Sequence, residues 1–385
     1  MEDPVKPDDA DEKWEQYYGH TRAKHQLLRY YLGPWMRKLG PNFPKIRVFD
    51  CFAGRGEYDA NSDTSPIELT EIETSTDIPG SPQIILDRAV EHSAISENIE
   101  CVFIEKTGKN ARILRDNLPA RRTLPDNISY KVVEGRFQDV TKEQVKKSGG
   151  WNLPAFFFID PYGYSQIEYD LITDLSCRSG HEILINLMAS EVIRWQDVDK
   201  HQDALKKPFG TDNWREELEN YEPDHLEHRE VGYYCERLQE NGPNETLAYL
   251  VTEEDSTAMK YYLVFGTNKS DGLEIMREGM RSCGPGKFAY APHREDIAND
   301  QSGLDQFYGN KVREKLLDLF SGETMPFDDL IKEYVVEEKR SAYRRKDIRS
   351  ELKDMEDEDL IDVTRVTSKT ERGLGGHDII SFPDE

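Results

Sequence analysis

The chain has 385 residues, of which 37% are hydrophobic and 10% aromatic, enough to bury the core of one large domain and one small one. Its 50 Lys and Arg residues against 75 Asp and Glu give a formal charge of -25. This balance opposes general affinity for nucleic acid, because phosphate contacts need basic residues. No apolar run is long enough to span a membrane, and the N-terminus carries no apolar signal core.

The excess of acid allows two interpretations. The simpler one is a solvated acidic surface. Acid spread over the whole chain also suggests adaptation to high salt, as in halophiles. The five cysteines form no Cys-x-x-Cys pair, which argues against a zinc or iron–sulfur site. An odd cysteine count without a secretory signal favours a reducing compartment, so we expect a cytoplasmic protein.

The N-terminal segment changes character at about residue 14. Residues 1–13 are acidic and contain proline, and they are predicted to be disordered. Trp14 to Leu39 has an aromatic and aliphatic face that predicts a helix, bent at Gly33-Pro34. Lys24 and His25 lie on this helix. His25 is interpreted as a partly buried structural histidine rather than a base.

The next element is a short apolar run that ends in an acid and a glycine loop. Ile46 to Asp50 suits a buried strand, and Gly54 and Gly56 let the backbone turn sharply and approach a ligand. Alone, this pattern is more typical of an ordinary strand-to-loop turn. No Gly-Lys-Ser/Thr follows, which argues against a Walker-type phosphate loop. The next helix is predicted to begin at Gly80-Ser81-Pro82, with Ser81 as its cap.

Three later apolar runs agree with the first. Glu100 to Glu105, Ser129 to Gly135 and Ala155 to Asp160 are predicted strands, and helical segments separate them. This β-α-β-α-β alternation predicts a parallel sheet of the doubly wound α/β class.

Three of the four strands end in an acid: Asp50, Glu105 and Asp160. In a parallel sheet these carboxylates lie on one edge, where Glu105 can accept both hydroxyls of a ribose. Three strand-end acids beside a glycine loop indicate a cofactor that contains a nucleoside. Because the loop is not a phosphate cradle, S-adenosylmethionine is the expected cofactor.

Asp160-Pro161-Tyr162 is the sharpest chemical signal in the sequence. The carboxylate and the Pro161 carbonyl can each accept a hydrogen bond from an NH2 group, and Tyr162 can stack on the ring that carries it. Catalysis would then be mostly positioning of a nitrogen lone pair toward a methyl donor. The alternative is a turn in which Asp160 caps the next helix and Tyr162 packs.

The second half of the chain completes the first domain and begins another. Residues 190–242 are polar and mostly helical, and they are interpreted as an insertion or cap over the active edge. Thr246 to Val251 and Tyr261 to Gly266 are predicted strands within a domain of residues 14–300. In residues 304–385, three helices and a hairpin predict a winged helix-turn-helix domain.

A basic cluster stands out in this last domain, at Arg344, Arg345, Lys346 and Arg349. On a recognition helix these residues could bind the phosphates of a nucleic acid. Equally open are ion pairs with neighbouring acids and a protein-binding face.

An ordered set of short motifs resembles the three-Cys-motif partner (TcmP) family over most of residues 14–290. The segments are Lys24-His25 within the first helix, Phe52 to Gly56, Gly80 to Pro82, Phe103 to Glu105, Phe158 to Gly163 and Tyr261 to Phe265. The resemblance implies a Rossmann-like class I methyltransferase sheet with an antiparallel last strand, S-adenosylmethionine as cofactor and a C-terminal winged helix. It also implies a partner protein with three cysteines.

Residue roles follow from the same resemblance. Cofactor-binding residues would be Asp50, Gly54 and Gly56 at the methionine end, Glu105 at the ribose and Phe137 near the adenine, together with Phe52 and Ser81. Asp160, Pro161 and Tyr162 would face the methyl acceptor. Two positions depart from the usual pattern: Arg136 stands where many class I enzymes have an acid, and the second proline of the amino-methyltransferase motif is absent.

The sequence therefore predicts a methyltransferase acting on a nucleobase amine in RNA or DNA. The alternative is a catalytically silent scaffold of the same fold that binds a partner protein or nucleic acid as a regulator.

Overall fold

A computed structural model gives the fold of this chain. It describes residues 19–59, 77–195, 198, 201–222, 228–252, 259–283, 288–289, 304–338, 343–367 and 373–384. The predicted disordered segment, residues 1–13, and the first turns of the predicted N-terminal helix lie outside these residues.

The described residues form a central sheet with the strand order β10-β8-β9-β7-β6-β1-β4-β5. Its strands are β1 (Ile46–Asp50), β4 (Ile99–Glu105), β5 (Ile128–Glu134), β6 (Ala155–Ile159), β7 (His181–Leu187), β8 (Glu245–Thr252), β9 (Met259–Thr267) and β10 (Phe288–Ala289). The neighbours from β7 to β5 pair in parallel, whereas β9 is antiparallel to both β7 and β8. This parallel-dominated sheet is compatible with a Rossmann-like methyltransferase fold.

The strand order reverses between β1 and β6. From β1 the chain moves outward through β4 to β5 and then returns to β6, on the other side of β1. Every residue of β1, β6 and β7 is buried, which explains their continuous apolar runs. Because the strand order reverses here, the carboxyl ends of β1 and β6 border the position at which open α/β sheets bind their ligands.

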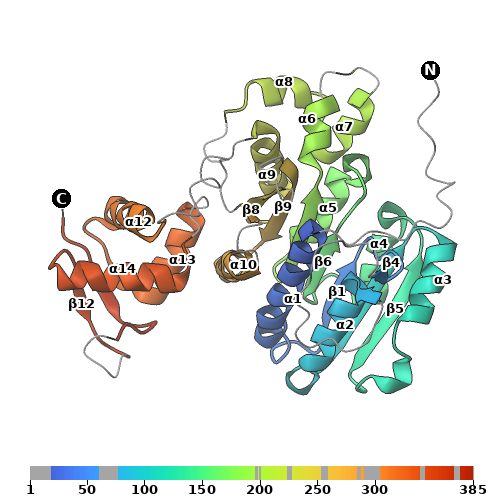
Figure 1. Ribbon diagram of the computed structural model, residues 1–385, viewed down its shortest axis with the longest axis horizontal. Helices are drawn as coiled ribbons and strands as arrows, with labels where there is room; N and C mark the ends of the chain where they lie inside the picture. The colour runs from blue at the N-terminus through green and yellow to red at the C-terminus, as the bar shows by residue number, and fades with distance from the viewer. Residues whose placement is uncertain are drawn as a thin grey trace.

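Helices cover both faces of the sheet (Figure 1). One face packs against α1 (Gly19–Leu39), α2 (Ser81–Glu91), α3 (Gly108–Asn117) and α10 (Ser270–Cys283). The other face packs against α4 (Phe137–Lys147), α5 (Tyr169–Ser176) and α9 (Arg229–Asn241). Successive residues of a strand therefore point into two separate cores. Every second residue faces α1, and the residues between them face the opposite side of the sheet.

The start of α2 differs from the sequence prediction. Gly80 is the N-cap, and Ser81 is the first helical residue, so Ser81 does not cap the helix. The Ser81 hydroxyl instead lies beside Asp50, where it favours the charged form of that carboxyl and lowers its pKa. Gly80 N donates to Gly56 O at 2.8 Å, and a Cβ on Gly80 would lie 2.7 Å from that oxygen. This close approach requires glycine at position 80.

Two further segments of the chain are a short strand pair after the glycine loop and a group of helices before β8. The short strands β2 (Glu57–Asp59) and β3 (Asp77–Pro79) pair where the sequence predicts a loop, and residues between them lie outside the described part. The predicted helical insertion contains α6 (Ala189–Trp195), α7 (Gln202–Phe209), α8 (Trp214–Glu219) and α9, at the upper end of Figure 1. Its aromatic core includes Phe209 stacked on Trp214, with ring centroids 5.5 Å apart.

The C-terminal part has its own small sheet. Its elements are α12 (Leu304–Phe320), β11 (Thr324–Pro326), α13 (Phe327–Glu337), α14 (Arg345–Asp357), β12 (Asp362–Thr364) and β13 (Ile379–Ser381). Antiparallel strands give the order β11-β13-β12. Helix α13 packs against α10, so this part continues the core on the α1 face of the central sheet.

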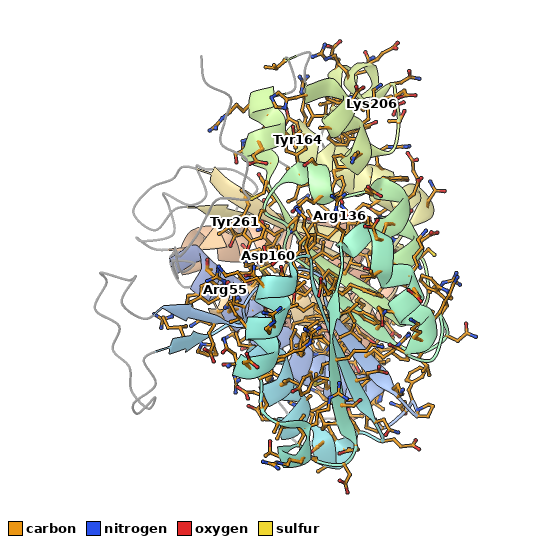
Figure 2. All side chains as sticks on the ribbon, turned by 90° about the vertical axis from the view of Figure 1, so that its right-hand side faces the viewer. Arg55, Arg136, Asp160, Tyr164, Lys206 and Tyr261 are labelled. Atoms are coloured by element: carbon orange, nitrogen blue, oxygen red, sulfur yellow. The ribbon has the colours of Figure 1, made fainter. Side chains whose placement is uncertain are left out.

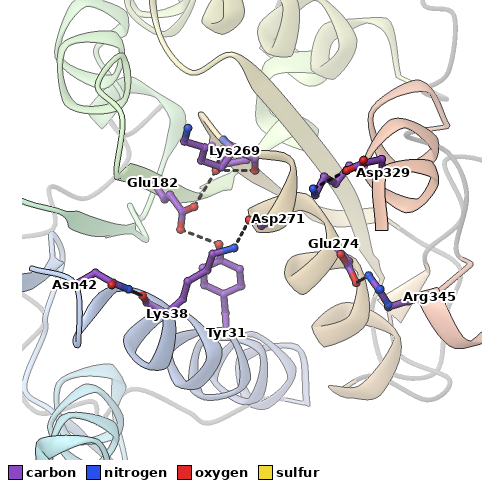
Figure 3. A network of polar contacts seen from close by, with 11 residues as sticks. Tyr31, Lys38, Asn42, Glu182, Lys269, Asp271, Glu274, Asp329 and Arg345 are labelled. Atoms are coloured by element: carbon purple, nitrogen blue, oxygen red, sulfur yellow. Dashed lines mark hydrogen bonds and ion pairs between the residues drawn. The ribbon is translucent and has the colours of Figure 1, made fainter. Parts of the chain in front are cut away.

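A buried carboxylate lies beneath α1, at the amino end of β7 (Figure 3). Glu182 accepts hydrogen bonds from Tyr31 Oη at 2.7 Å and Thr267 Oγ1 at 2.8 Å. Burial raises its pKa to about 7, although the two hydroxyls and Trp35 favour the charged form. The neighbouring ion pair of Lys38 with Asp271 joins α1 to α10.

Glu182 predicts a pH dependence of stability. Between the unfolded pKa, 4.5, and the folded pKa, about 7, the folded state keeps a proton that the unfolded state releases. Stability therefore falls as pH rises through this window, by on the order of 2–3 kcal/mol. Urea unfolding across the window should show this fall, and Glu182→Gln should remove about half of the total slope, because Asp50 titrates over the same window. Asp50, with a pKa also raised to about 7, should leave a residual slope. Exposed Glu143→Gln is the control, and an unchanged slope in Glu182→Gln would contradict the prediction.

Candidate functional site

Three acids occupy the carboxyl ends of neighbouring strands. Asp50 ends β1, Glu105 ends β4, and Asp160 follows β6, and these strands are adjacent in the order β4-β1-β6. The alternation of side chains directs all three toward the face that carries α1 and α2. The fold thus brings the predicted acids to one edge, at the reversal of strand order.

Asp50 is fully buried, with an exposed fraction of 0%. Its Oδ1 accepts a hydrogen bond from Phe52 N at 3.2 Å, whereas Oδ2 has no hydrogen-bond partner among the described residues. Burial raises the pKa of Asp50 to about 7; the charge of Asp160 adds to this effect and Lys24 opposes it. A buried acceptor without a donor is costly, so this oxygen fits a ligand that donates.

The glycine loop follows directly. Gly54 and Gly56 have φ of 58° and 85°, in the left-handed region that favours glycine. Ala53 N donates to Ile104 O at 2.9 Å, and Gly54 N donates to Glu105 Oε2 at 3.2 Å. The loop is therefore tied to the end of β4, beside both acids.

Glu105 is fixed by the turn that follows it. Its Oε1 accepts from Thr107 N at 2.8 Å and from Thr107 Oγ1 at 2.9 Å. Its Oε2 faces the glycine loop, and the carboxylate retains lone pairs for a further donor. Thr107 also caps α3, so Glu105 couples the loop to that helix.

Phe137 and Arg136 lie at the end of β5. Phe137 begins α4 and is 2% exposed, and its ring packs on Phe52 with centroids 5.4 Å apart. Arg136 is the N-cap residue of α4, and its side chain is exposed. The buried Phe137 ring therefore packs against the Phe52 ring, while the Arg136 side chain is exposed at the carboxyl edge of the sheet.

Asp160 is held from two sides by Lys24 and Asn186, whose positions beside it the sequence does not predict. Lys24 of α1 forms an ion pair with Asp160 Oδ2, and Asn186 Nδ2 at the end of β7 donates to Oδ1 at 2.7 Å. The Lys24 ammonium also lies 5.7 Å from the ring centroid of Tyr261, which neighbours Asp160 in Figure 2. Such a buried ammonium requires a paired anion, so Lys24 and Asp160 stabilise each other.

His25 follows Lys24 but does not titrate near neutrality. Burial lowers the pKa of His25 to about 3, and the Lys24 charge lowers it further. The ring is therefore neutral and packs near Tyr58, with centroids 5.7 Å apart. This geometry agrees with a structural role for His25.

Tyr162 extends from the edge. Its side chain is 69% exposed, and its backbone N donates to Gln166 Oε1 at 3.0 Å. Gly163 and Glu168, not Asp160, are the N-caps of the two following helices. The alternative turn, with Asp160 as a cap and Tyr162 packed, is therefore not what the structure has.

The basic cluster of the C-terminal part is partly used within the protein. Arg344 pairs with Asp347 at 2.9 Å, and Arg345 pairs with Glu274 of α10 at 3.3 Å and also with Asp328. The Arg349 guanidinium lies 5.0 Å from the ring centroid of Phe327. Lys346 is exposed. Two of the four charges are thus compensated by acids.

No family model matches the sequence, and no curated protein matches it. Among solved structures, a Legionella pneumophila protein of family DUF519 is 14% identical, with a TM-score of 0.43; the match covers 71% of this chain and 95% of that one. A precorrin-6y C5,15-methyltransferase from Geobacter metallireducens is 12% identical, with a TM-score of 0.26, over 67% of this chain and 95% of that one. A Pyrococcus horikoshii protein provisionally named a transferase is 15% identical, with a TM-score of 0.29, over 62% of both chains. These TM-scores are too low to carry an argument about function.

Two classes of site find no support in the part of the chain that the structure describes. It contains no group of three or more His, Cys, Asp or Glu side chains arranged to hold a metal ion. Within the same residues, every helix is too short or too polar to cross a membrane.

Proposed function

We propose that this chain transfers a methyl group from S-adenosylmethionine to an amino group of a nucleobase in RNA or DNA. The observation that carries the proposal is the row of Asp50, Glu105 and Asp160 on adjacent strands, with the glycine loop among them. Ligands of open α/β sheets bind at this edge, where the strand order reverses.

The residues on the cofactor side fit a nucleoside that carries an amino acid. The buried Oδ2 of Asp50 suits an ammonium donor, which would also favour its charged form. Glu105 retains acceptor capacity for ribose hydroxyls. Besides these two acids, the cofactor would contact Phe52, Gly54, Gly56, Ser81 and Phe137. When bound, the cofactor supplies an electrophilic methyl group.

The residues on the acceptor side suit a flat amine. Lys24 and Asn186 fix the Asp160 carboxylate, and its remaining lone pairs can accept from an NH2 group. Asn186 Oδ1 is buried without a donor among the described residues, so it offers a second acceptor. The Pro161 carbonyl and the exposed Tyr162 ring would complete the site. Orientation of the amine, rather than proton transfer, would be the main contribution to rate.

Calorimetric titration with S-adenosylmethionine tests the cofactor site. Wild-type protein should release or absorb heat with micromolar affinity, and Glu105→Ala should weaken binding by about 10- to 100-fold, because charge-assisted hydrogen bonds are lost. Glu100→Ala is the matched control, since Glu100 lies near the amino end of the same strand and pairs with Lys45 and Lys131. Folded wild-type protein that gives no heat would contradict the proposal.

A silent scaffold is the second candidate, and one observation favours it. Both oxygens of Asp160 already have protein partners, as expected of a site that no substrate enters. A scaffold of this kind could bind the cofactor yet transfer no methyl group to total RNA or genomic DNA. The two candidates therefore separate on transfer, not on cofactor binding.

We further propose that residues 304–385 form a winged helix and that the chain belongs to the TcmP family, with residues 14–300 as its methyltransferase-like domain. The order helix, strand, helix, helix, strand, strand supports the winged helix. Nucleic-acid binding through its basic cluster stays a prediction, and the ion pairs of Arg344 and Arg345 weigh against it. A three-Cys partner protein also stays a prediction.

A further inference from the structure

Three neighbouring strands are each followed by a basic side chain at the same edge of the sheet. Arg55 lies in the loop after β1, Lys106 follows β4 and Arg136 follows β5. Because adjacent strands are roughly 5 Å apart, the row from β1 to β5 spans about 10 Å. We refer to Arg55, Lys106 and Arg136 as the cationic rim.

The charges of the rim are not neutralised within the part of the protein that the structure describes. Lys106 and Arg136 are exposed and have no acid within ion-pairing distance there. Arg55 donates its Nε to Asn110 Oδ1 at 3.0 Å, and this amide is neutral. Lys206, by contrast, pairs with two aspartates. These three basic side chains are therefore available to an external anion such as a phosphate, on an edge that also carries Glu105 and the exposed Glu134.

The rim lies beside the proposed acceptor site. Arg55 follows β1, which pairs with β6 just before Asp160, whereas Lys106 and Arg136 follow the next two strands on the same side of Asp160. A base that reaches Asp160 must leave its stack, so its strand has to be single or locally opened. Phosphates of the nucleotides next to that base would then lie along the same edge, where long basic side chains can contact them.

We propose that the cationic rim binds the backbone phosphates of a single-stranded nucleic-acid substrate. This inference rests on the proposed function, since it names the surface that holds the substrate of that site. It assigns the phosphate contacts to the edge of the sheet rather than to the C-terminal basic cluster, where Arg344 and Arg345 are already paired.

The salt dependence of binding tests the rim without requiring catalysis. Fluorescence anisotropy of a labelled single-stranded RNA of about 16 nucleotides, and of the matching DNA, gives the affinity between about 50 and 200 mM salt. Each phosphate contact on a single strand contributes a slope of about 0.7 in log K against log salt. The double variant Lys106→Ala/Arg136→Ala should therefore lower the slope by about 1.4, twice that contribution. Adding Arg55→Ala should lower it again.

Two single variants serve as matched controls. Arg122→Ala removes an exposed arginine that precedes β5, at the opposite edge of the sheet, and should leave the slope unchanged. Lys346→Ala removes the exposed charge of the C-terminal cluster and should do the same. Calorimetry with S-adenosylmethionine should give the same affinity for Lys106→Ala/Arg136→Ala as for wild type, which shows that the variant is folded.

Several outcomes would overturn the proposal. They are an absence of oligonucleotide binding by wild type, an unchanged slope in the rim variant, and a loss of slope in Lys346→Ala instead. Tighter binding of duplex DNA than of either single strand would also overturn it. A failure of the proposed function gives a different result. The salt dependence of oligonucleotide binding would still be weaker in the rim variant, but the wild-type protein would bind no S-adenosylmethionine.

Discussion

Replacing Asp160 with alanine is expected to lower kcat for methyl transfer by on the order of 10³-fold, because the group that orients the acceptor amine is removed. Affinity for S-adenosylmethionine should stay within about threefold, since the cofactor contacts are assigned to Asp50 and Glu105. Incorporation of labelled methyl groups into total RNA and genomic DNA measures the rate, and calorimetry measures the affinity.

The alanine variant also has a cost in stability. Asp160 is the ion-pair partner of Lys24, whose side chain is only 7% exposed, and it accepts the Asn186 amide. Its removal leaves a buried ammonium without a counter-charge, which destabilises a fold by several kcal/mol. Asp160→Asn keeps the shape and one acceptor oxygen, so it separates loss of chemistry from loss of fold. Its kcat should fall by about 10²-fold.

A matched variant and a decisive outcome complete this experiment. Asp174→Ala removes an exposed aspartate of α5 that pairs with Lys142, and methyl transfer should be unchanged. If folded Asp160→Ala transfers methyl groups at the wild-type rate, the assignment of Asp160 is wrong. If wild type binds the cofactor but transfers nothing, the silent scaffold is the better description.

The sequence predicts the middle of the sheet well because β1, β6 and β7 are buried on both faces. Val48-Phe49 and Phe156 to Ile159 are apolar throughout, and an acid follows each run directly. Burial of this kind leaves a direct trace in composition, and β-α-β alternation then fixes the direction of the strands. The shared edge of Asp50, Glu105 and Asp160 follows from direction alone.

The partners of Asp160 could not be predicted in the same way. Lys24 and Asp160 are 136 residues apart in the chain, and periodicity places Lys24 only on a helix. The contact depends on how α1 packs against α2 and α10, which is tertiary information. Asn186 carried a weaker signal, since it is a polar residue near the end of an apolar strand. A polar residue in such a position merits attention as a site residue.

The N-cap of α2 is a second feature that the sequence did not predict correctly. Ser81 precedes a proline at a helix start, which is typical of a capping serine. In the structure Gly80 is the N-cap and Ser81 is the first helical residue, so the Ser81 hydroxyl lies beside Asp50, where it lowers the pKa of that carboxyl. The basic cluster at Arg344 and Arg345 illustrates the same point for charge. Acids that pair with it come partly from α10, more than 70 residues earlier in the chain.

Replacing Arg277 with methionine is expected to destabilise the protein by about 2–4 kcal/mol. Arg277 lies on α10 and is 1% exposed. Its Nη2 donates to Val335 O at 3.1 Å and to Glu338 O at 2.8 Å, at the end of α13. Methionine keeps part of the packing but leaves both carbonyls without this donor.

The reason for the size of the effect is the position of Arg277 between the two parts of the chain. Arg277 belongs to α10, which packs on β8 and β9 of the central sheet, and its hydrogen bonds reach the end of α13, so one side chain joins these two parts. Urea denaturation followed by circular dichroism measures the change. Two transitions in Arg277→Met, in place of one in wild type, would show that the C-terminal part unfolds separately.

Arg112→Met is the matched control, because Arg112 is an exposed arginine on α3 and should change stability by less than about 0.5 kcal/mol. Arg277→Lys should recover part of the loss, since an ammonium can reach one carbonyl but not span two at the angle of a guanidinium. If Arg277→Met is as stable as wild type, the hydrogen bonds to Val335 and Glu338 do not hold α13 against α10, and the apolar contacts between these helices carry the interface alone.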